Sequence, residues 1–184
     1  MTKVGILVGS LRKESFSKKL SINVASLFPE GYDAEFIEIG NLVIYNQDFD
    51  DEHNVPSEYT TFRNNIKGMD AVLFVTPEYN RSVPAVLKNA LDVGSRPYGA
   101  NVWNGKPAAI ISQSPGNLSG FGANHHLRQS LVFLNMPILQ QPEAYIGGMA
   151  DLLDENDKIK NDGTVKFLQS FVDAFVDLIE KHQA

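Results

Sequence analysis

The 184-residue sequence contains no cysteine. This absence excludes disulfides, cysteine-ligated iron–sulfur clusters and thiolate nucleophiles, including those of the small cysteine-dependent phosphatases. The longest apolar runs are also too short to span a membrane, and no secretory signal pattern is present. We therefore expect a cytoplasmic protein with no membrane partner.

Charge is also limited. Charged residues make up 21% of the chain and the formal net charge is −6, which gives no electrostatic basis for binding nucleic acid. The hydrophobic content of 43% is ordinary for a globular protein. A chain of this length can bury a complete core, so we predict a single domain over residues 1–184.

Two glycine-rich nucleotide motifs are missing, G-x-G-x-x-G and G-x-x-x-x-G-K-[ST], which argues against a dinucleotide Rossmann loop and a nucleotide-hydrolase loop. Instead, the buried-strand pattern of Val4–Gly9 leads into a Ser- and Arg-containing loop, and helical spacing begins after Ser15. A helix start with hydroxyls and Arg12 beside it is suited to a phosphate monoester. The open alternative at this point is a Ser-capped helix with solvated basic residues.

Five strands alternate with helices in the hydropathy pattern. We predict three buried strands and two edge strands, and five helices: strands at Val4–Gly9, Ala34–Ile39, Asp70–Thr76, Lys106–Ser112 and Met136–Leu139, with helices at about 15–28, 57–68, 82–91, 125–134 and 164–179. Ser82 is expected to cap the third helix. The acidic segment of residues 40–56 is expected to be a solvated loop. The pattern predicts an α/β doubly wound parallel sheet of order 2-1-3-4-5 with helices on both faces, so that the loops after the first and third strands flank one crevice.

The residues in those two loops resemble a known family. Gly9-Ser10-Leu11-Arg12-x-x-Ser15-Phe16, followed by Thr76-Pro77-Glu78-Tyr79-Asn80-x-Ser82-x-Pro84-x-x-Leu87-Lys88-Asn89-Ala90-x-Asp92, is similar to the NADPH-dependent FMN reductases. The resemblance runs from about Lys3 to Gly148. It implies a flavodoxin-like fold, FMN as cofactor and NADPH or NADH as co-substrate.

The resemblance also implies a set of cofactor-binding residues. The phosphate loop corresponds to Ser10, Leu11, Arg12, Lys13, Ser15, Phe16 and Ser17, the isoalloxazine edge to Pro77, Glu78, Tyr79 and Asn80, and the pyrimidine end to Ser112, Gln113 and Ser114. We expect no catalytic side chain, because the flavin carries the chemistry. For Glu78, a salt-bridged carboxylate at a subunit interface is favoured over a general base. No metal is expected, because the adjacent His125 and His126 face different directions on a helix and have no third ligand spaced nearby.

The predicted function is therefore a two-electron, ping-pong transfer from NAD(P)H through FMN to quinone-like or other small acceptors. The alternatives are an electron carrier of the flavodoxin type and a reductase that supplies reduced free FMN to a partner oxygenase. By the same resemblance, the chain is expected to form at least a homodimer through helices near Val83–Leu91 and Leu127–Leu134. The acceptor, the choice between NADPH and NADH, and dimer against tetramer stay open.

Overall fold

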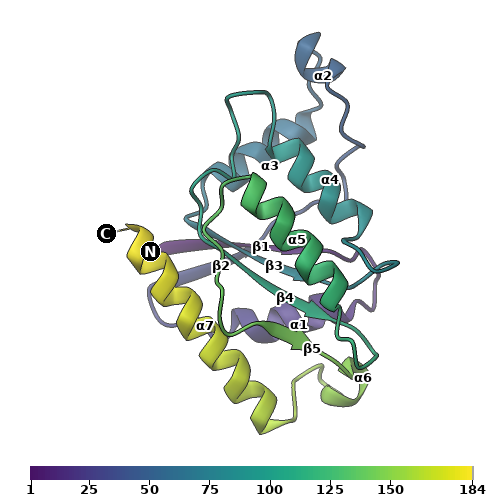
Figure 1. The fold of residues 1–184 in the computed structure, drawn as a ribbon, viewed down its shortest axis with the longest axis vertical. Helices are drawn as coiled ribbons and strands as arrows, with labels where there is room; N and C mark the ends of the chain where they lie inside the picture. Colours follow the sequence, from purple (N-terminus) through teal and green to yellow (C-terminus); the bar gives the residue numbers. More distant parts are fainter. Residues whose placement is uncertain (184) are drawn as a thin grey trace.

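The computed structural model describes residues 1–183 and contains one five-stranded parallel sheet of order β2-β1-β3-β4-β5. Helices cover both faces of the sheet (Figure 1). The elements in chain order are β1 (Thr2–Val8), α1 (Phe16–Ala25), β2 (Tyr32–Phe36), α2 (Asp48–Asp51), α3 (Ser57–Lys67), β3 (Ala71–Thr76), α4 (Ala85–Gly94), β4 (Ala108–Gln113), α5 (Phe121–Phe133), β5 (Ala144–Ile146), α6 (Met149–Leu152) and α7 (Asp162–Gln183). The predicted fold class and strand order are confirmed.

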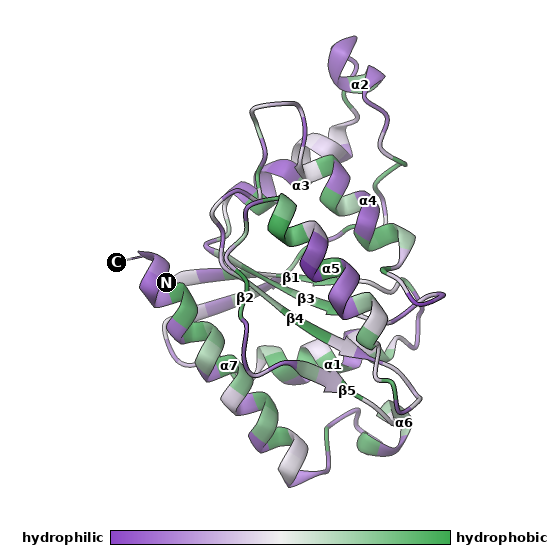
Figure 2. Ribbon diagram, viewed as in Figure 1, coloured by the Kyte–Doolittle hydropathy of each residue, from purple (hydrophilic) through white to green (hydrophobic). Residues whose placement is uncertain are grey.

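The two faces of the sheet carry separate cores. Side chains alternate along each strand, so β4 sends Ile110 into the core beneath α3, α4 and α5 and Ile111 into the core beneath α1 and α7. Figure 2 shows the hydrophobic colour along β3 and β4, whereas α7 carries hydrophobic and hydrophilic residues in alternation along its length. Phe171 and Phe175 of α7 are buried, as their spacing predicts.

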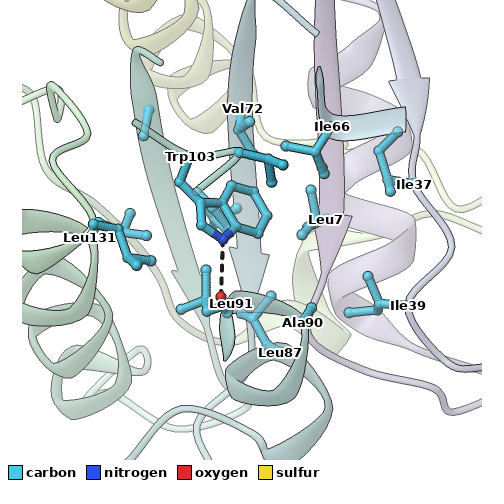
Figure 3. Packing of buried hydrophobic residues seen from close by; sticks show 14 of the residues in the cluster. Leu7, Ile37, Ile39, Ile66, Val72, Leu87, Ala90, Leu91, Trp103 and Leu131 are labelled. Carbon is cyan, nitrogen blue, oxygen red and sulfur yellow. Dashed lines mark hydrogen bonds between the residues drawn. The ribbon is translucent and has the colours of Figure 1, made fainter. Parts of the chain in front are cut away.

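A tryptophan fills the centre of the first core. Trp103 is fully buried and its indole Nε1 donates a hydrogen bond to the carbonyl of Leu91 at 3.0 Å, as Figure 3 shows. A Cβ at Gly94 would lie 2.5 Å from the same nitrogen, so glycine is needed for this close approach. The packing fixes the C-terminal end of α4 against the loop that leads into β4.

Several predicted boundaries are wrong. The fifth strand is Ala144–Ile146 rather than Met136–Leu139, because the apolar run forms a single bridge, Ala108 to Ile138, before polar residues interrupt it. The second strand ends at Phe36, although Ile37 and Ile39 beyond it are buried.

The helix starts also differ. Ser82 does not cap α4, whose N-cap is Pro84, and α5 begins at Phe121 rather than at His125. Within the acidic segment of residues 40–56, Asp50 is not solvated. It forms a two-pronged ion pair with Arg63 at 2.8 Å, with both side chains at most 10% exposed. No helix within residues 1–183 is long and apolar enough to cross a membrane.

Candidate functional site

Three loops meet at the carboxyl edge of the sheet. They follow β1, β3 and β4, which are neighbours in the sheet, and they enclose a pocket of about 160 Å³. We call it the edge pocket; its lining comprises Ser10, Arg12, Ser15, Phe16, Pro77, Glu78, Tyr79, Gln113, Ser114 and Pro115. The topology thus brings together residues more than one hundred positions apart in the sequence, as expected where strand order reverses.

The first loop ends in the predicted helix cap. Ser15 is buried and its Oγ accepts a hydrogen bond from the backbone N–H of Lys18 at 3.2 Å, which leaves the hydroxyl proton free to donate. The first N–H groups of α1 lack acceptors within the helix and face the same end. A Cβ at Gly9 would lie 2.9 Å from Thr76 Oγ1, so glycine lets the loop leave β1 close against β3. The arrangement offers hydroxyl, amide and Arg12 donors to an anion.

The second loop is a tight hairpin. Tyr79 and Ser82 exchange two backbone hydrogen bonds of 3.1 and 3.0 Å, and the two residues between them have positive φ angles of 51° and 65°. This is the backbone of a type I′ turn, in which asparagine is favourable at Asn80 and an arginine at Arg81 is strained. Tyr79 is left 48% exposed beside the pocket.

Glu78 joins this hairpin to α5. One carboxylate oxygen accepts a hydrogen bond from the backbone N–H of Ala123 at 3.0 Å, and the other lies 3.5 Å from Arg81. The carboxylate thereby supplies the cap for α5 that Gly120, its N-cap residue, lacks. A Cβ at Gly122 would lie 2.9 Å from the same oxygen, so the approach requires glycine. Glu78 is thus engaged in capping and ion pairing within the chain, and its expected place at a subunit interface stays a prediction.

The third loop presents a buried amide to the pocket. Gln113 is 4% exposed; its Nε2 donates to Ser17 Oγ at 2.8 Å, while its Oε1 is buried without a hydrogen-bond partner. Gln113 faces α1 because it continues the alternation of Ala109 and Ile111 along β4. Its amide therefore lies beside the start of α1, and the place at the pyrimidine end of the flavin that the resemblance implies for Gln113 stays a prediction. A buried acceptor without a donor is costly, so the site is prepared for a ligand that brings one.

Not all predicted residues line the edge pocket. Ser17 lies beneath it as the partner of Gln113, and Ser112 faces α5, where it donates to the carbonyl of Ser119 at 2.9 Å and so holds the third loop. Leu11, Lys13 and Asn80 are exposed around the pocket. Sequence reasoning missed Pro115, which follows Ser114 directly in the same loop.

A histidine and a tyrosine are also in hydrogen-bond contact near the start of α5. The imidazole of His125 is 3.0 Å from the hydroxyl of Tyr145, and the ring of Phe121 stacks on His125 with centroids 4.2 Å apart. Burial, followed by a hydrogen bond to Glu143, raises the pKa of Tyr145 to about 12. This tyrosine is therefore neutral at physiological pH. Within residues 1–183 no three acidic or histidine side chains are gathered for a metal ion.

The comparisons with known proteins agree with this geometry. The chain is 53% identical to a quinone reductase of Pseudomonas putida over 98% of its own length and 96% of the relative's, and 44% identical to a 2-hydroxy-1,4-benzoquinone reductase of Burkholderia over 94% and 93%. The solved structure of FerB, a flavoenzyme NAD(P)H:acceptor oxidoreductase from Paracoccus denitrificans, superposes with a TM-score of 0.93 at 41% identity over 99% of both chains. The model of the NADPH-dependent FMN reductases matches residues 2–151, so the chain belongs to that family.

Proposed function

We propose that the protein is an FMN-dependent NAD(P)H oxidoreductase that reduces quinones. The observation that carries this is the edge pocket, in which an anion-binding helix start, a buried unpaired acceptor and the Pro77–Asn80 hairpin surround one space. The names of the relatives from Pseudomonas putida and Burkholderia support a quinone as acceptor. Overall, NADPH, a proton and a quinone give NADP⁺ and a hydroquinone.

The residues fit FMN by their chemistry. Ser10, Ser15, the first N–H groups of α1 and Arg12 would hold the phosphate, since charged acceptors strengthen such hydrogen bonds. The free Oε1 of Gln113 would accept a hydrogen bond from a hydroxyl of the sugar chain, which is the kind of donor the buried amide lacks. Pro77 and Tyr79 would border the ring end. When bound, FMN supplies hydride acceptance and two-electron transfer, and the chain orients it.

We further propose that donor and acceptor use the pocket in turn. The structure of residues 1–183 contains one sheet, and the edge pocket lies at its carboxyl edge. NAD(P)H and the quinone would therefore bind there one after the other, which is a ping-pong order. Glu78 is occupied by the N–H of Ala123, so the proton that completes the hydroquinone would come from water. The cytoplasm is the proposed location, because the phosphorylated nicotinamide nucleotides do not cross membranes unaided.

The decisive experiment follows NADPH oxidation by purified, FMN-loaded protein with and without a benzoquinone. We expect oxidation that depends on the quinone, with parallel lines in double-reciprocal plots at several quinone concentrations. Loaded protein that leaves NADPH unconsumed would instead support the carrier of the flavodoxin type. Rapid loss of the flavin from the protein during turnover would support the supply of free reduced FMN to a partner.

We also propose a homodimer formed through α4 and α5. A groove of about 470 Å³ runs between these helices, and Phe133 at its rim is 89% exposed beside the 69% exposed Val132. An isologous contact would bury these side chains. In sedimentation, the parent should behave as a dimer, and Phe133→Asp should shift it to a monomer near 20 kDa. A parent that is monomeric at micromolar concentration would refute this.

A further inference from the structure

A second pocket adjoins the edge pocket on the side of β2. It has a volume of about 300 Å³, and its lining includes Ser10, Leu11, Arg12, Lys18, Phe36 and Glu38. We call it the side pocket. Ser10 and Arg12 line both pockets, so the two spaces meet at the loop that follows β1. The lining of the side pocket comes from β1 and the loop after it, from Lys18 on α1, and from the end of β2 with the residues that follow it.

Lys18 is an ammonium group without a close counter-ion in this pocket. Its Nζ lies 3.3 Å from the centroid of the Phe36 ring, whereas the neighbouring Lys19 is paired with Glu14 and Asp157 at 2.9 Å each. Burial lowers the pKa of Lys18, and the more distant charge of Glu38 opposes that shift. A ligand anion beside Nζ would restore the stabilisation that the ammonium loses by leaving water.

The size of the co-substrate points to this pocket. The nicotinamide half of NADPH and FMN are built alike, with a flat ring system, a five-carbon ribose or ribityl unit and a phosphate. If the two rings stack and the molecules run alongside one another, the adenosine half of NADPH begins where the FMN phosphate ends. That phosphate is assigned to the loop of Ser10 and Arg12, which is also one wall of the side pocket.

The carboxylate of Glu38 lines the side pocket just after the end of β2. It follows β2 by two residues; in dinucleotide-binding α/β folds an acidic side chain in this region bonds the ribose 2′-hydroxyl of NAD, whereas a basic group accommodates the 2′-phosphate of NADP. One oxygen of Glu38 accepts the N–H of Gly40 at 2.5 Å, which leaves the other for a hydroxyl. The pocket therefore combines one acceptor with two cations.

We propose that the side pocket binds the adenosine 2′-phosphate of NADPH, with Lys18 and Arg12 as the cationic contacts and Glu38 beside the ribose. This inference rests on the proposed use of NAD(P)H. Other basic groups near the edge pocket are less suited, because Arg81 lies near Glu78 and Lys88 is paired with Asp92 at 2.8 Å. Lys88 also lines the groove assigned above to a second copy of the chain.

The test uses FMN-loaded protein and the probe 2′,5′-ADP, titrated by calorimetry. Lys18→Gln should weaken probe binding about tenfold, the effect of one charge-assisted hydrogen bond, and should raise the KM for NADPH by the same factor. The KM for NADH and the Kd for FMN should stay within about twofold of the parent. Glu38→Gln keeps an acceptor but removes a negative charge, so it should tighten probe binding. Lys166→Gln on α7 changes the net charge equally and should alter none of these values.

Equal probe binding by the Lys18→Gln and Lys166→Gln variants would overturn the proposal. So would equal increases in KM for NADPH and NADH, because the pocket would then contact the diphosphate that both share. The proposed function fails by a different result, namely a loaded parent protein that oxidises neither nucleotide. The calorimetric titration measures the Kd of 2′,5′-ADP, which does not depend on whether the enzyme turns over.

Discussion

Replacing Gln113 with leucine should separate two roles of one buried side chain. In the protein without FMN, the unpaired Oε1 costs about 1–3 kcal/mol, and the bond from Nε2 to Ser17 contributes about 0.5–1.5 kcal/mol. Leucine removes the unpaired oxygen at similar volume, but it leaves the buried hydroxyl of Ser17 without its partner, at a cost of about 1–3 kcal/mol. The free energy of unfolding should therefore change by between about a 2 kcal/mol loss and a 2 kcal/mol gain.

FMN binding should respond in the opposite direction. Without Oε1, a sugar hydroxyl enters the pocket with no acceptor, at a cost of about 1–3 kcal/mol, or roughly five- to 150-fold in Kd. Fluorescence titration of the flavin-free variant with FMN measures the affinity, and chemical denaturation of the same preparation measures stability. A strong loss of FMN affinity without a matching loss of stability would therefore show that the Gln113 side chain acts in binding rather than in folding.

Gln169→Leu is the matched control. Its amide on α7 donates to the carbonyl of Leu27 at 3.2 Å and to Asp173 at 2.8 Å, so its loss should lower stability and leave FMN binding unchanged. An FMN affinity of the Gln113→Leu variant equal to that of the parent would refute the role of Gln113. A loss of stability well above about 2 kcal/mol would show that Oε1 is already satisfied in the flavin-free protein.

Two further substitutions test other contacts. Arg12→Ala should weaken FMN binding by about 1.5–3 kcal/mol in the same titration, because a charge-assisted contact to the phosphate is lost; an unchanged Kd would contradict the phosphate assignment. Asp50→Ala should lower the free energy of unfolding by about 3–5 kcal/mol, because Arg63 keeps a buried charge without its partner. Asp50→Ala combined with Arg63→Met should recover much of that loss in denaturant titrations, and a double variant no more stable than Asp50→Ala alone would argue against the pair.

The sheet order could be predicted because it depends on patterns that sequence displays directly. The runs that became β3 and β4 are buried on both faces, and such strands stay uniformly apolar. The fifth strand could not be located, because Met136–Leu139 is as apolar as a strand while β5 has only three residues. Its pairing with β4 is set by where the chain returns to the sheet, which no local pattern records.

The buried charges of residues 40–56 were missed for a related reason. Asp50 stands among other acidic residues and has no feature of its own in the sequence. Its burial depends on Arg63 of α3. The Nε of Arg63 also donates a hydrogen bond to the carbonyl of Val93 on α4 at 2.9 Å. A carboxylate is buried only when such a partner is available, so its environment follows from tertiary contacts rather than from composition.

The same distinction explains why the cofactor was easier to predict than the acceptor. The groups assigned to the phosphate and sugar, such as Ser15 and Gln113, are buried, and hydrogen bonds to the backbone or to Ser17 hold them in place. The capping role of Ser15 could be inferred from residue type and position, whereas the unpaired oxygen of Gln113 could be seen only in the structure. Phe16, Pro77 and Tyr79 also line the edge pocket, and Tyr79 is 48% exposed. Apolar and aromatic side chains accept many flat molecules through contact area rather than through directional bonds, so these residues favour a quinone without selecting a particular one.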